Sequence, residues 1–94
     1  MTPDRASFYF ANLGADIIRC ALALESGNIK NYEASRERAW KTLSRLEKEN
    51  HPEAYEEGLL MLRGLLYAHA SQELSRFRRN VDDLIAPFAL RLAL

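Results

Sequence analysis

Residues 2–27 read TPDRASFYFANLGADIIRCALALESG, and this stretch decides the fold class. Thr2 can cap a helix that Pro3 opens, and Gly27 can end it. Between them, apolar residues recur at spacings of three and four positions, which is the periodicity of one helix face. The members of this stripe are Phe10, Leu13, Ile17, Ala21 and Leu24. The stretch therefore predicts an amphipathic helix with one buried face.

The same periodicity returns twice further along the chain. Residues 27–50 form a second helical segment, and Pro52 breaks its pattern and opens a third. The second stripe contains Tyr32, Ala39, Leu43 and Leu46, and Trp40 widens it. The third stripe contains Tyr55, Leu59, Leu62, Leu66 and Ala70. The connections between the three segments are short, so we expect neighbouring helices to run antiparallel.

The last quarter of the chain is patterned less clearly. Residues 71–80 are mostly polar and predict a fraying helix end followed by a connection. Asn80 then resembles the N-cap of a short last helix, which Pro87 would kink or divide. The sequence thus predicts an all-α fold, an up-and-down antiparallel helical bundle of three long helices and a short C-terminal helix. Its length of 94 residues predicts a single domain, residues 1–94.

Charge and cysteine content narrow the class of protein. Thirteen Lys and Arg balance thirteen Asp and Glu, so no global field attracts nucleic acid or an anionic membrane. Cys20 is the only cysteine and cannot form an internal disulfide, which favours a reducing compartment. The first residues lack the pattern of a signal peptide. The longest apolar run, residues 84–94, is shorter than the roughly 20 residues of a membrane span. We therefore expect a cytoplasmic protein without membrane contact.

The motif that most suggests chemistry is RGLLYAH, residues 63–69. Its R-x5-H spacing is similar to the R-x4-6-H motif of the HEPN family of small helical bundles, many of which are ribonucleases while others partner nucleotidyltransferases. The resemblance implies that Arg63 would hold a phosphate and that His69 would act as the acid or base. Gly64 departs from the family pattern, in which a polar residue usually follows the Arg.

Helix geometry offers a different interpretation of the same pair. On one α-helix, six positions place Arg63 and His69 about 120° apart and about 9 Å apart along the axis. They would then meet over one substrate atom only if the helix were distorted or a second subunit contributed. The helical wheel places His69 inside the apolar arc and Arg63 at its margin, which predicts a buried or interfacial histidine with one hydrogen bond. No other catalytic set, metal-ligand set or cofactor motif stands out, so we expect no metal and no cofactor. The sequence favours a protein that is not an enzyme.

Two other features predict binding. The cluster RFRR, residues 76–79, interleaves an aromatic residue with Arg76, Arg78 and Arg79, a pattern that nucleic-acid contacts use. Asp82 and Asp83 follow closely and would offset much of its field, so a solvated connection is the simpler interpretation. A nucleic-acid partner is the alternative interpretation of this cluster.

Surplus apolar residues are the second feature. The third helical segment and the C-terminus carry more large apolar residues than one buried face requires. We expect these residues to form the interface of a homodimer: Leu60, Met61, Tyr67, Leu84, Phe88 and Leu92. The leading hypothesis is a helical-bundle protein that acts by self-association, by binding a protein partner, or by both. The alternative is an HEPN-like ribonuclease or nucleotidyltransferase partner.

Overall fold

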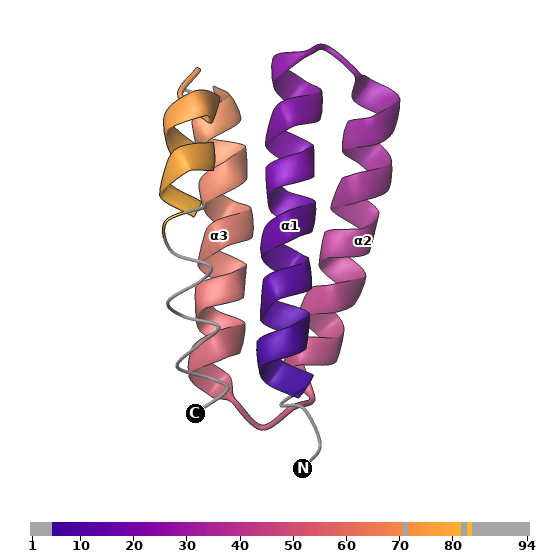
Figure 1. Cartoon of the computed structure of the whole chain (residues 1–94), viewed down its shortest axis with the longest axis vertical. Helices are drawn as coiled ribbons and strands as arrows, with labels where there is room; N and C mark the ends of the chain where they lie inside the picture. Colours follow the sequence, from indigo (N-terminus) through magenta and orange to yellow (C-terminus); the bar gives the residue numbers. More distant parts are fainter. Residues whose placement is uncertain (1–4, 71, 82, 84–94) are drawn as a thin grey trace.

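The computed structural model describes residues 5–70, 72–81 and 83, and it confirms the all-α fold. Three long helices follow one another, α1 (Arg5–Glu25), α2 (Ile29–Glu47) and α3 (Pro52–Ala70). A short helix follows them at 74–81. Consecutive helices run in opposite directions, and α1 stands between α2 and α3 (Figure 1).

The core is centred on α1, which supplies most of its largest fully buried side chains. Phe10, Leu13 and Ile17 have no exposed surface, as their spacing predicted. By length and composition α1 could also cross a membrane, but here its apolar face packs against the bundle. The second predicted stripe is buried as well, whereas Trp40, which was expected to widen it, is 46% exposed.

In α3, the sequence predicted the buried face only in part: Leu62 is 3% exposed as expected, but the buried face is rotated from the predicted stripe. Leu66 was assigned to the core stripe and is 49% exposed, whereas Met61 was placed outside it and is 4% exposed. Small residues explain the difference, because they let α3 approach α1 and α2 closely. A Cβ atom on Gly58 would lie 2.6 Å from Leu13 Cδ2 and 3.1 Å from Leu43 Cδ1. The small residues on the buried face of α3 are Ala54, Gly58 and Ala68.

The prediction that 71–80 is a connection was wrong, because the chain is already helical at 74. Gln72 adopts a φ of 62°, and the N–H of Glu73 donates to Ala68 O at 2.8 Å. This pattern closes α3 tightly and turns the chain back. Phe77 then packs against the core and over Gly64, where an added Cβ would lie 2.8 Å from the ring. The predicted kink at Pro87 lies outside the described residues.

Candidate functional site

The structure does not bring Arg63 and His69 together within one copy of the chain. Both side chains are exposed on α3, which is α-helical without interruption between them, so they point about 120° apart. His69 was expected to be buried or interfacial. It is exposed in the single chain, so the buried alternative is wrong, because the buried residues of α3 lie on a different face of the helix. Its ring lies 6.5 Å from that of Tyr32 and lines a hollow that also contains Arg76 and Arg79.

The RFRR cluster is split between different surroundings. Phe77 faces the core, so it is not free to stack on a nucleic-acid base. Arg78 Nη2 pairs with Glu25 Oε2 at 3.5 Å, while Ser75 Oγ donates to Glu25 Oε1 at 2.8 Å. These contacts attach the short helix 74–81 to the end of α1. Of the three arginines predicted to bind a ligand, Arg76 and Arg79 stay exposed.

The predicted interface residues also divide. Leu60 and Tyr67 are 58% and 72% exposed, as an interface would need before association. Met61 is buried beneath the short helix 74–81 and belongs to the core, so the structure corrects its assignment to an interface. Leu84, Phe88 and Leu92 lie outside the described residues.

A second apolar surface, which sequence reasoning missed, runs along the outer edge between α2 and α3. Two contacts fix how these helices align: Tyr32 lies beside His69, and Leu43 lies against Gly58. Trp40 is therefore level with the middle of α3, on the side of α2 that faces away from α1. On α3, Leu66 lies on the side that also faces away from α1. Its exposed fraction is similar to that of Trp40, 49% against 46%.

We call this surface the α2–α3 seam and define it by Trp40, Leu59 and Leu66. A charged side chain lies at each end of the seam and contacts a tyrosine. At one end Arg36 lies 5.3 Å above the centre of the Tyr32 ring. At the other end the hydroxyl of Tyr55 donates to the Glu47 carboxylate, and this hydrogen bond raises the pKa of Tyr55. The seam is thus an apolar strip with a cation at one end and an anion at the other.

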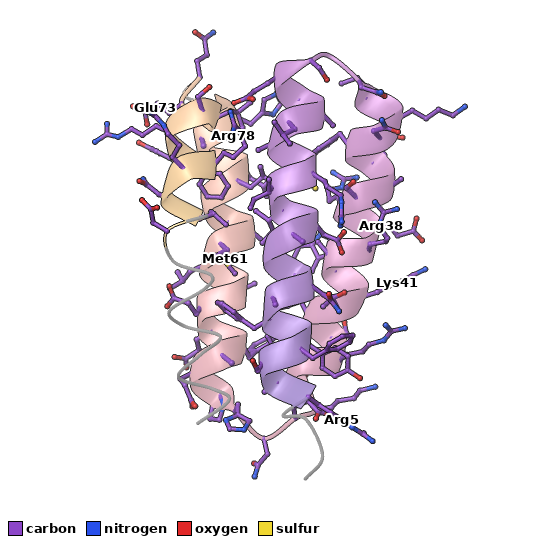
Figure 2. All side chains as sticks on the ribbon, in the orientation of Figure 1. Arg5, Arg38, Lys41, Met61, Glu73 and Arg78 are labelled. Atoms are coloured by element: carbon purple, nitrogen blue, oxygen red, sulfur yellow. The ribbon has the colours of Figure 1, made fainter. Side chains whose placement is uncertain are left out.

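The opposite side of α2 carries the main buried polar network among the described residues. Asp16 is 6% exposed and lies in the middle of α1. Its Oδ1 accepts hydrogen bonds from Arg19 Nη1 at 2.8 Å and from Arg38 Nε at 3.4 Å. Arg38 Nη2 also donates to Ser35 Oγ at 3.1 Å. A buried carboxylate thus contacts two guanidinium groups at a surface groove between α1 and α2, which we call the α1–α2 groove and define by Asp16, Arg19 and Arg38. Figure 2 labels Arg38 on this side of α2.

Cys20 lies on α1, one helical turn after Asp16, and is fully buried. Its Sγ is 3.9 Å from Tyr32 O, to which the thiol donates a weak hydrogen bond. Burial, together with the charge of Asp16, raises the pKa of the Cys20 thiol from 9.0 to about 11. Because the thiolate is the nucleophile, this cysteine is poorly suited to catalysis.

The burial of Cys20 predicts slow reaction of its thiol in the native protein. At pH 8 the native thiol should react with a disulfide reagent only as fast as the bundle opens, and the thiol in urea should react at once.

The raised pKa of Cys20 predicts how stability changes with pH. The unfolded thiol ionises near pH 9 and the folded one near pH 11, so the unfolded state binds fewer protons between these values. The free energy of unfolding should therefore fall as the pH rises from 9 to 11. Urea titrations should show a smaller fall in Cys20→Ala; equal slopes would contradict the assignment.

Within the described part of the chain, no group of three or more His, Cys, Asp or Glu side chains is placed to hold a metal ion. Comparison of the chain with protein-family models, with curated proteins and with solved structures gave no significant match. The functional argument therefore rests on the two surfaces of α2: the apolar α2–α3 seam and the α1–α2 groove.

Proposed function

We propose that this protein is a cytoplasmic, non-enzymatic association module that pairs with a second copy of itself through the α2–α3 seam. The observation that carries the proposal is the seam itself, where Trp40 of α2 and Leu66 of α3 each expose about half of their surface. Large apolar side chains that gather on one face of a small protein mark an association surface. The buried free thiol of Cys20 is consistent with a reducing compartment.

The charges beside the seam favour a second copy as its occupant. Arg36 and Glu47 stand at opposite ends of the seam, about 16 Å apart along α2, with Trp40 near the midpoint. A two-fold axis through that midpoint would place Arg36 opposite the partner's Glu47, and Glu47 opposite the partner's Arg36. Such a self-complementary patch is what a two-fold interface requires. The zero net charge of the chain adds no long-range repulsion between copies.

Light scattering on the full chain tests this proposal. At tens of micromolar, we expect the native protein to have twice the mass of one chain, which is 10.8 kDa. Leu66→Lys should shift it to monomer, because a charge buried in the apolar seam has no partner. The matched control is Leu22→Lys, since Leu22 is an equally exposed leucine, at 46%, on another face. A native monomer, or equal effects of the two variants, would contradict the proposal.

Two further variants test the placement and orientation of the interface. Arg36→Glu should weaken the dimer, and the double variant Arg36→Glu/Glu47→Arg should restore it by exchanging the two charges. Leu60→Lys alters the apolar surface on the other side of α3 and should leave the mass unchanged. If Leu60→Lys dissociates the dimer and Leu66→Lys does not, the interface lies beside the short helix 74–81, and the seam is not the contact.

A further inference from the structure

The α1–α2 groove consists of two adjoining hollows of about 410 and 360 Å³, which share Arg19 and Arg38. The first hollow is lined mainly by small and polar residues, and the second by cations. The charged residues of the combined lining are Arg19, Arg38, Lys41, Arg45 and Asp16. Four cations therefore face one buried carboxylate in a chain whose total charge is zero. The groove is a local concentration of positive charge.

The buried carboxylate makes part of this groove rigid. Asp16 forms ion pairs with Arg19 and Arg38. These contacts orient both guanidinium groups before any ligand binds. Each guanidinium has five N–H donors. Among the described residues, these contacts use one donor of Arg19 and two of Arg38. The remaining donors are available at the surface, because the two side chains are 59% and 55% exposed.

The cations form a row rather than a single point. Arg38, Lys41 and Arg45 are spaced three and four positions apart, so they line one face of α2 over about 10 Å. Figure 2 shows Arg38, Lys41 and Arg5 in succession along the α1–α2 side of the molecule. Lys41 has an ion pair with Glu37 at 3.4 Å, but both side chains are about two-thirds exposed or more and exchange partners readily. A row of this length suits a chain of anions better than one anion.

An exposed aromatic residue extends the same surface. On α1, Ala15 and Leu22 line the groove, and Phe8 precedes Ala15 by seven positions, which places it on the same face. Phe8 is 60% exposed, whereas the aromatic residue of the RFRR cluster is turned into the core. Cations that follow a backbone together with an exposed aromatic ring are the two elements of single-strand recognition.

We propose that the α1–α2 groove binds the phosphate backbone of a single-stranded nucleic acid, with Phe8 stacking on a base. The preorganised arginines Arg19 and Arg38 hold one phosphate, and Lys41 and Arg45 hold the next. This site lies on the side of α2 away from the α2–α3 seam, so a dimer formed through the seam leaves it open. The proposal does not depend on self-association.

Fluorescence anisotropy with a labelled 12-nucleotide single strand, as RNA and as DNA, tests this site on the full chain. If the four cations neutralise two phosphates, log affinity should fall with log salt at a slope of about −1.4. A rise from 50 to 200 mM salt should then weaken binding about sevenfold. Absence of binding at 50 mM salt would overturn the proposal.

Matched charge variants locate the site. Lys41→Gln/Arg45→Gln should reduce the salt slope by about 0.7 and weaken binding at low salt. The control Lys30→Gln/Lys48→Gln removes the same charge from α2 and its C-cap residue, at positions that do not line the groove. Phe8→Ala should weaken binding about fivefold or more and leave the salt slope unchanged. Equal effects of the two double variants would overturn the site.

Competition identifies the source of the phosphate. An unlabelled strand should displace the probe at micromolar concentration, whereas inorganic phosphate and a mononucleotide should require millimolar concentration. Displacement by a mononucleotide as effective as that by the strand would show a site for one phosphate and overturn the proposal of a strand. Equal displacement by polyglutamate would show a general polyanion surface and overturn it as well.

Discussion

Phe10→Ala is expected to lower the free energy of unfolding by about 4 kcal/mol. Phe10 has no exposed surface and lies on α1, the helix that both α2 and α3 pack against. Removing its ring leaves a cavity that the surrounding helices can close only in part. Because small domains unfold at about 5–15 kcal/mol, this change alone removes a large share of the stability. Urea denaturation followed by circular dichroism measures it.

Phe8 provides the control for this prediction within the same helix. It is 60% exposed, two positions before Phe10, and differs from it chiefly in the face of α1 that it occupies. Phe8→Ala should change the free energy of unfolding by no more than about 0.5 kcal/mol. If the two alanine variants were equally destabilised, the assigned orientation of α1 would be wrong.

Gly58→Leu should have the second largest effect, about 3 kcal/mol of destabilisation. The first atom of the new side chain would already lie 2.6 Å from Leu13 Cδ2. Leu13 and Leu43, the two nearest neighbours of that position, are themselves buried and have no space to move into. The helices must therefore separate at the level of Gly58, where α3 packs against Leu13 of α1 and Leu43 of α2. Thermal unfolding should show a lower midpoint for the whole bundle.

A second glycine on α3 distinguishes global from local overpacking. Gly64→Leu would meet the Phe77 ring, which belongs to the short helix 74–81 and is only partly buried. We expect this variant to loosen the short helix and leave α1 and α2 protected. Amide hydrogen exchange should show faster exchange at 74–81 alone in Gly64→Leu, and throughout the chain in Gly58→Leu. The reverse pattern would contradict the packing described for both glycines.

The helices of the bundle follow from local signals, whereas the buried face of its third helix does not. Phe10, Leu13 and Ile17 recur at spacings of three and four on α1, so periodicity alone identified them. The third helix is apolar on several sides, and periodicity selected Leu66 where packing selects Met61. The deciding signal was a row of small residues, since close approach of two backbones requires them.

The candidate surfaces were harder to predict because each depends on residues from two helices. Asp16 and Arg38 are 22 positions apart, and no local pattern pairs them. A charged residue between Leu13 and Ile17 was nevertheless a usable signal, because a carboxylate within a buried stripe must find partners. The pair Arg63 and His69 was attractive because its members lie only six positions apart in sequence, yet helical geometry points their side chains about 120° apart.

The close pairing of α1 with α2 has a consequence for folding kinetics. These two helices are joined by a short turn at Gly27, and most of the packing in the described chain is between them or close in sequence. Local pairing of this kind has a low loop-closure cost and is typical of domains that fold in microseconds to milliseconds. The hairpin of residues 5–47 can thus form first and serve as the template on which α3 docks. In any transient opening that releases α3, the α1–α2 groove would persist while the seam is lost.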